Sequence, residues 1–127
     1  MPTIRMSSRL LYPFWILSLF LVVTGSLLPA TSPMMRAVAL LPVGAKPLHF
    51  CAYAWLALLA LLAIRRRPFA VTAALATVLL GVALEFGQKL IPGRGFEIRD
   101  MFINGAGVLS GVAVVVLSRT ILAAARS

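Results

Sequence analysis

The chain has 127 residues, of which 61% are hydrophobic and 12% are charged, and its mean hydropathy is +1.03. A soluble globular domain usually has about a quarter of its residues charged, so this composition excludes an ordinary soluble domain and indicates a membrane protein. The net charge of +9 does not predict a nucleic-acid partner, because the basic residues are scattered at the ends of apolar segments, where they contact lipid headgroups.

Four apolar stretches are long enough to cross a bilayer, whose hydrocarbon core of about 30 Å needs roughly 17 to 25 residues of helix. In chain order, we predict transmembrane helices at residues 10–28, 47–64, 68–91 and 101–118. Together they predict an all-α fold, a bundle of four transmembrane helices with short connections. No stretch remains for a second domain, so we expect a single membrane domain over residues 1–127.

The first apolar stretch has an alternative interpretation as a secretory signal peptide, since Arg5 and Arg9 precede it. Its apolar run exceeds the usual core of about 7–15 residues, and Leu28 occupies a position where a cleavage site needs a small residue. A retained helix is therefore the favoured interpretation. The connection that follows, residues 29–45, is apolar for a loop, and we expect a short helix there along the outer membrane surface.

The distribution of Lys and Arg predicts the orientation, because these residues are enriched in cytoplasmic loops. Four spans place both termini on one side. That side would hold Arg5, Arg9, Arg65, Arg66, Arg67, Arg119 and Arg126, and the other side would hold Arg36, Lys46, Lys89, Arg94 and Arg99. Seven basic residues against five, with three of them in one compact connection, predict that both termini are cytoplasmic.

Polar side chains interrupt three of these apolar stretches, and Glu85 is the most informative of them. Ionisable groups in membrane segments are costly, so they usually face a protein interior and mark a functional site. Residues three or four apart share one face of a helix. The pairs on such faces are His49 with Tyr53, Glu85 with Gln88, and Asp100 with Asn104. All three faces open toward the predicted outer side, with Glu85 about 10 Å below the helix break at Pro92, so we predict a polar pocket there.

These residues form a pattern whose order, spacing and hydrophobic setting extend over residues 46–111. The pattern reads Lys46-x2-His49-Phe50-x2-Tyr53, then Glu85-x2-Gln88, then Arg94-x5-Asp100-x3-Asn104-x2-Gly107-x3-Gly111. It resembles the VanZ-like membrane proteins, a family named for a protein linked to resistance against glycopeptide antibiotics of the teicoplanin type. One departure is Ala45, at a position where members often carry an acidic residue, so no role for a carboxylate is carried over to that position.

The resemblance implies a multi-pass protein of the bacterial cytoplasmic (inner) membrane that works on the cell envelope, with no established biochemical activity. We expect it to bind or handle an envelope molecule, either a lipid headgroup or a lipid-linked precursor, and to have membrane lipids as partners. The predicted binding residues are Lys46, His49, Tyr53, Glu85, Gln88, Arg94, Asp100 and Asn104.

A phosphate would be bound by Arg94, Lys46 and the start of the fourth helix, since arginine forks match phosphate oxygens and helix N-termini attract anions. Asp100 is expected to cap that helix. Glu85 in a low-dielectric setting is expected either to keep its proton or to pair with a cation, for which His49 and Arg94 are the candidates. The candidate partners of Asp100 are Lys46, Arg94 or Arg99.

Catalysis is an alternative, in which His49 and Glu85 act as an acid–base pair on a lipid-linked substrate. No Ser or Cys nucleophile has an evident place beside them. His49, Glu85 and Asp100 are possible metal ligands by type, but no paired-His motif is present, so we predict neither a metal nor another cofactor.

Two further interpretations stay open. The polar residues would hold the helices together through interhelical hydrogen bonds, each worth roughly 0.6 to 2 kcal/mol. Alternatively, the protein would serve as a scaffold or accessory subunit, with a homo- or hetero-oligomer in the membrane. The spacing of Gly107 and Gly111, and of Ala83 and Gly87, predicts close contacts between helices in any of these cases.

Overall fold

The structure, a computed structural model, describes residues 8–126. Arg5, which contributes to the predicted orientation, lies outside the described residues. The described part is all-α, as predicted, with the helices α1 (Ser8–Leu27), α2 (Pro33–Ala39), α3 (Ala45–Ala63), α4 (Arg67–Gln88) and α5 (Ile98–Ala124). The four long helices are each long and apolar enough to cross a membrane, which confirms the four predicted spans.

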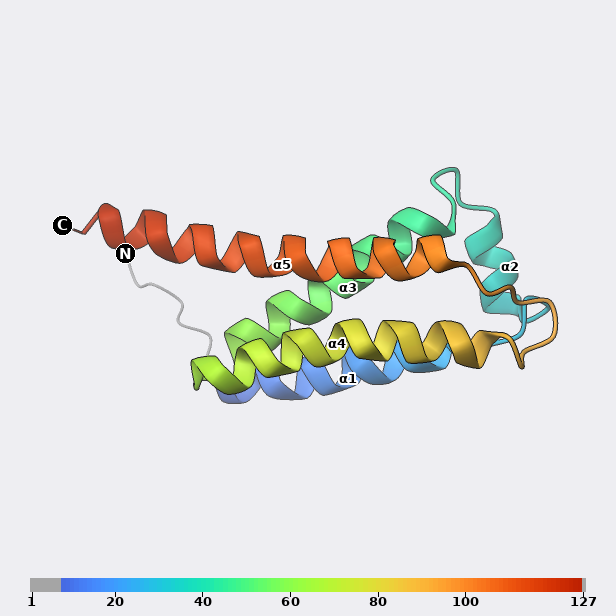
Figure 1. The fold of residues 1–127 in the computed structure, drawn as a ribbon, viewed down its shortest axis with the longest axis horizontal. Coiled ribbons are helices and arrows are strands. Elements are labelled where there is room, and N and C mark those ends of the chain that lie inside the picture. The colour runs from blue at the N-terminus through green and yellow to red at the C-terminus, as the bar shows by residue number, and fades with distance from the viewer. Residues whose placement is uncertain (1–7, 127) are drawn as a thin grey trace.

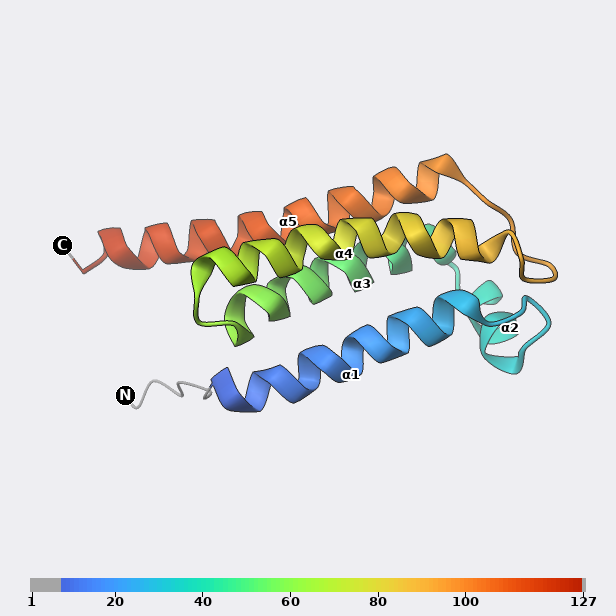
Figure 2. The same cartoon turned by 60° about the horizontal axis from the view of Figure 1, so that its bottom comes forward.

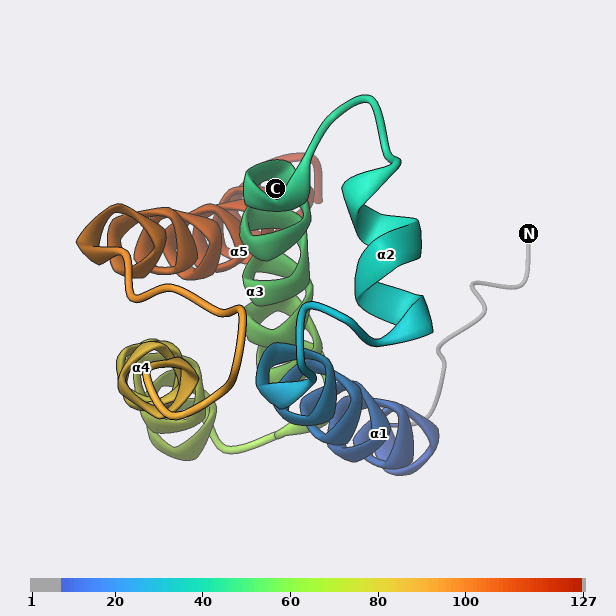
Figure 3. The same cartoon turned by 90° about the vertical axis from the view of Figure 1, so that its right-hand side faces the viewer.

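The long helices run lengthwise through the molecule, and the short helix α2 lies across one end (Figure 1). We call this end the α2 end, and the opposite end, at the α3–α4 connection with Arg65, Arg66 and Arg67, the arginine end. Figure 2 shows α1 set apart from α5, and Figure 3 shows α3 in the middle with α1, α4 and α5 around it. Helix α3 contacts all three, and its most extensive contact is with α5. Which end faces the cytoplasm stays a prediction.

The boundaries of α4 and α5 differ from the prediction in ways that affect the site. Helix α4 ends at Gln88 rather than residue 91, because the next three amides form tight turns in which each bonds the carbonyl three residues earlier, ahead of Pro92. Helix α5 begins at Ile98 rather than residue 101 and continues beyond residue 118 to Ala124. At this earlier start, the amide of Glu97, the residue before the helix, donates a hydrogen bond to the side chain of Glu85.

The predicted short helix in the connection 29–45 is present as α2. Ser32 precedes it and caps it, since the hydroxyl oxygen accepts a hydrogen bond from the amide of Met35 at 3.3 Å. Pro33 occupies the first helical position, where the missing amide hydrogen costs no hydrogen bond.

Small residues let α5 lie directly on α3. A Cβ atom added at Gly107 would lie 2.4 Å from the carbonyl oxygen of Phe50, and one added at Gly111 would lie 2.3 Å from the carbonyl oxygen of Ala54. The predicted contact at this glycine pair is therefore confirmed. Gly87 approaches α1 instead, with Leu27 3.2 Å from the equivalent position, while Ala83 is exposed.

The buried core follows the same helices and is narrow. It includes one cluster around Tyr53, Ala57, Ala74 and Val108 and a second around Leu61, Ala70 and Val115. The other buried apolar residues are Leu56, Leu59, Ala60, Ala63 and Leu84. Most other large apolar side chains of the long helices are exposed, as expected where lipid tails take the place of water.

Candidate functional site

Polar side chains from three helices meet inside the bundle towards the α2 end. Tyr53 from α3, Glu85 from α4 and Asn104 from α5 are all nearly fully buried. Gly81 makes room for Tyr53 and Asn104, because a Cβ atom there would lie 3.0 Å from the ring of Tyr53 and 3.3 Å from the amide nitrogen of Asn104. The structure thus brings together residues that the sequence placed at one depth on separate helices.

The carboxylate of Glu85, which is 1% exposed, is held by the backbone rather than by a cation. Its Oε2 atom accepts a hydrogen bond from the amide of Glu97 at 3.2 Å. Neither His49 nor Arg94, the candidate cationic partners, forms a hydrogen bond or salt bridge with Glu85 in residues 8–126, although both lie near enough to interact with it electrostatically. The direct contact is made instead by the amide of Glu97, which lies at the end of the α4–α5 loop.

Glu97 is a site residue that sequence reasoning missed. Its own carboxylate forms a salt bridge with Lys46 at 3.1 Å, with side chains that are 54% and 43% exposed, respectively. This pair connects the start of α5 to the start of α3. A signal was available, because Glu97 is one of only three acidic residues in the chain and lies three positions after Arg94.

The expectations for Asp100 are corrected by the position of the helix start. Asp100 lies in the first turn of α5, so Glu97, not Asp100, occupies the capping position. None of Lys46, Arg94 and Arg99 forms a salt bridge with Asp100 in the described part of the chain. Its Oδ1 atom, like that of Asn104, is buried and has no hydrogen-bond partner within residues 8–126.

Arg94 extends from the α4–α5 loop towards the end of α1. Its Nη2 atom donates to the carbonyl oxygen of Ser26 at 3.2 Å, and its Nη1 atom lies 3.3 Å from the sulfur of Met35. The side-chain amide of Gln88 donates to the same carbonyl at 3.0 Å. Ser26 belongs to the last turn of α1, where carbonyl groups lack partners within the helix, so it is a natural acceptor.

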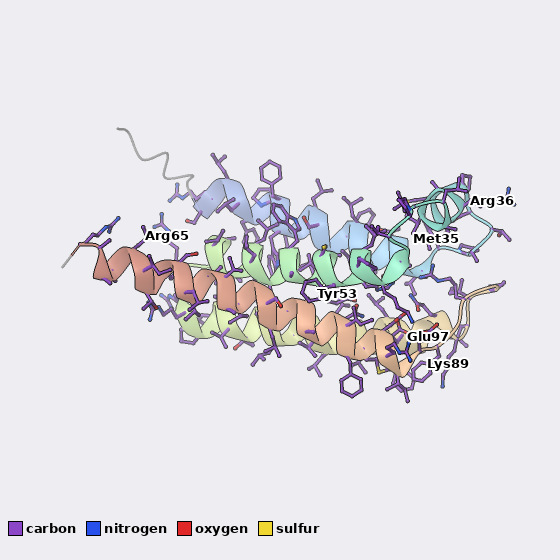
Figure 4. All side chains as sticks on the ribbon, turned by 90° about the horizontal axis from the view of Figure 1, so that it is seen from above. Met35, Arg36, Tyr53, Arg65, Lys89 and Glu97 are labelled. Atoms are coloured by element: carbon purple, nitrogen blue, oxygen red, sulfur yellow. The ribbon has the colours of Figure 1, made fainter. Side chains whose placement is uncertain are left out.

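The role of α1 was also missed, since the predicted pocket was assigned to the other three long helices. A signal was available, because the last carbonyl groups of a helix have no partners within that helix. The predicted topology also places the end of α1 on the same side of the membrane as the loop that contains Arg94. Figure 4 shows Met35 and Glu97 towards the same end of the molecule, with Tyr53 further inside.

A cavity of about 460 Å³ lies between α1, α2, α3 and the α4–α5 loop. Its walls are mostly apolar and include Val22, Met34, Met35, Val38 and Leu48. Five of the eight predicted binding residues line it, namely His49, Tyr53, Gln88, Arg94 and Asp100. The other three, Lys46, Glu85 and Asn104, do not line the cavity. Lys46 forms its salt bridge with Glu97, which does line the cavity. Glu85 and Asn104 are buried inside the bundle. That this grouping is a functional site stays a prediction.

Two chemical alternatives meet this geometry differently. His49 lines the cavity, but no hydrogen bond joins it to Glu85 among the described residues, so the direct contact of an acid–base pair is not formed. Within residues 8–126, no group of three or more His, Cys, Asp and Glu side chains is placed to hold a metal ion.

Comparison with known families decides the wider classification. A family model described as VanZ/LLP1 matches residues 2–119. The chain belongs to the VanZ/LLP1 family. The resemblance inferred from the motifs is therefore confirmed, and the VanZ/LLP1 match extends beyond those motifs to include α1 and α2. With its four spanning helices, this VanZ/LLP1 member is an integral membrane protein. No curated protein and no solved structure matches the chain.

Proposed function

We propose that this VanZ/LLP1 protein binds the phosphate-bearing headgroup of an envelope lipid in the cavity at the α2 end. The observation that carries the proposal is that Arg94 lines the cavity without a carboxylate partner among the described residues. This half-buried guanidinium lines a largely apolar cavity and forms no salt bridge with any carboxylate of the described residues. It uses one donor on a carbonyl and one on a sulfur, while an arginine has five donors. The oxygens of a phosphate group can accept hydrogen bonds from the remaining N–H donors.

The rest of the cavity supports an amphipathic ligand. The apolar walls from α1, α2 and α3 suit an acyl or isoprenoid chain, because such a chain can pass from the bilayer to these walls without exposing apolar surface to water. Asp100 also lines the cavity, and its Oδ1 atom has no partner in residues 8–126. A buried polar atom of this kind usually has a partner, so a hydroxyl or ammonium group next to the phosphate would fit it.

Family membership supports the envelope as the setting. We propose that the α2 end faces the outside of the bacterial cytoplasmic membrane, with both termini in the cytoplasm, as the basic residues predict. The ligand would then come from the outer leaflet, as a phospholipid or as a lipid-linked precursor of the cell wall. A glycopeptide-resistance-related role follows by association with the family and would operate through this ligand.

The test is substitution of Arg94 by Gln, with Arg99→Gln as the control. Both remove one positive charge near the start of α5, but the exposed Arg99 does not line the cavity. Hydrogen bonds to charged groups contribute about 1.5–3 kcal/mol, so Arg94→Gln should weaken lipid binding by roughly 10- to 150-fold. Native mass spectrometry of the purified protein with phosphatidylglycerol and phosphatidylethanolamine measures this loss.

Thermal unfolding in the same detergent checks that Arg94→Gln is folded, because the contacts to Ser26 and Met35 are lost as well. Unchanged lipid binding by the folded variant would end the proposal. An equal loss in Arg99→Gln would show that surface charge, and not the cavity, attracts the lipid.

A further inference from the structure

A second cavity lies at the arginine end of the bundle, at the opposite end from the cavity lined by Arg94. It has a volume of about 320 Å³ and is bounded by the end of α3, the start of α4 and the C-terminal half of α5. Three arginines line it: Arg65 from the α3–α4 connection, Arg67 from the first turn of α4, and Arg119 from α5. Figure 4 shows Arg65 at the opposite end of the molecule from Glu97 and Lys89.

No acidic side chain compensates these arginines. The three acidic residues of the chain are Glu85, Glu97 and Asp100, and all of them lie towards the α2 end. Within residues 8–126, no Asp or Glu lies within salt-bridge distance of the three arginines. The cavity is therefore a concentration of positive charge at a membrane boundary, where charges are screened less than in bulk water.

The contacts of the arginines hold two of them in place while leaving donors free. Arg119 donates from Nη2 to the carbonyl oxygen of Leu61, in the last turn of α3, at 2.9 Å. Arg65 donates from Nε to the hydroxyl of Ser8 at 2.7 Å. Each contact uses one of five guanidinium donors, so both side chains are oriented and still able to bind an anion.

The remaining walls are apolar and are continuous with the surface that faces lipid. They include Leu61, Ile64, Val71, Val112 and Val116, of which Val71 and Val116 are exposed. An inorganic anion would use only the arginines, whereas a phospholipid would use the arginines for its phosphate and the apolar walls for the upper part of its acyl chains. Basic pockets between transmembrane helices have this combination of features where they bind anionic headgroups.

We propose that this cavity is a binding site for the phosphate of an anionic phospholipid in the leaflet at the arginine end. The site does not rest on the function proposed for the α2 end and uses none of its residues. The arginine run at residues 65–67 would then both orient the protein and bind a specific lipid, in contrast to a run that acts only through its total charge.

The experiment uses the full chain in detergent with the Arg94→Gln substitution as background, so that the other cavity contributes as little as possible. The double variant R65Q/R67Q removes two arginines of the cavity and leaves the Arg119–Leu61 hydrogen bond intact. The matched control R66Q/R126Q removes two charges from the same end at exposed residues that do not line the cavity. Native mass spectrometry measures binding of phosphatidylglycerol, of phosphatidylcholine, and of inorganic phosphate.

We expect R65Q/R67Q to bind phosphatidylglycerol about 30-fold more weakly, at roughly a factor of five for each arginine, and R66Q/R126Q to bind it within about twofold of the parent. Equal losses in both double variants would overturn the proposal in favour of diffuse surface charge. No loss in R65Q/R67Q, with folding confirmed by thermal unfolding, would also overturn it. Binding of inorganic phosphate as tight as that of phosphatidylglycerol would show a simple anion site and overturn the assignment to a lipid.

Discussion

The close contact between α3 and α5 can be tested with two Gly→Ala variants of α5. Their comparison separates the effect of packing on the unfolding free energy from the effect of helix propensity. Gly111→Ala places a methyl group 2.3 Å from the carbonyl oxygen of Ala54 and 3.1 Å from the Cβ atom of Ala57. A carbon–oxygen contact is normally no closer than about 3.3 Å, so the two backbones must separate by roughly 1 Å. Overpacking of this kind costs about 1–3 kcal/mol.

Gly105→Ala is the matched control on the same helix. No atom lies within 4 Å of a Cβ atom at Gly105, so the substitution adds a methyl group without a clash. Replacing a mid-helix glycine with alanine stabilises a helix by about 0.5–1 kcal/mol, and this gain applies equally at both positions. The difference in unfolding free energy between the two variants therefore isolates the overpacking cost, with Gly111→Ala less stable by about 1–3 kcal/mol.

The assay is reversible unfolding in mixed detergent, followed by circular dichroism. The Gly107→Ala/Gly111→Ala double variant should lose less than the sum of the single losses, because both methyl groups press on the same stretch of α3 and one separation relieves both. If Gly105→Ala and Gly111→Ala changed the unfolding free energy equally, the inferred close approach of α5 to α3 would be refuted.

Two further predictions concern the polar contacts at the α2 end. Glu85→Leu leaves the amide of Glu97 without its acceptor and should lower the unfolding free energy by about 1–3 kcal/mol. Glu85→Gln keeps an acceptor, so its loss of unfolding free energy should be less than half as large. Equal losses for the two variants, measured by unfolding in detergent, would contradict the contact between Glu85 and Glu97. Lys46→Ala removes an exposed salt bridge and should lower the unfolding free energy by less than about 1 kcal/mol. This loss should become smaller as the salt concentration rises from about 0.05 to about 1 M, because salt screens exposed charges. A larger or salt-independent loss would mean that Lys46 has a second role.

The helices were predictable because they depend on properties that the sequence displays directly. An apolar stretch of sufficient length must become a helix in lipid, since every backbone group needs an internal hydrogen bond. The close contact at Gly107 and Gly111 was predictable for a related reason, because small residues one turn apart favour close helix approach.

The pairing of polar groups was not predictable in the same way. Charged side chains were the candidate partners of Glu85, but the direct hydrogen bond comes from a backbone amide. Asp100 was assigned to the helix cap, but α5 begins before it. Both differences have one origin, which is that hydropathy predicts where a helix lies and leaves its ends uncertain by several residues. Hydrogen-bond partners at those ends change with each residue of shift.

By itself, the sequence determined that this VanZ/LLP1 protein is a bundle of four spanning helices with a few polar residues at a shared depth. Composition, segment length and helical spacing carry that information, because they act locally along the chain. Only the tertiary structure decided that Ser26 of α1 and the loop residue Glu97 join the site, and that Arg94 lines a cavity without a carboxylate partner in the described residues. Those contacts depend on how the helix ends and the α4–α5 loop meet in space.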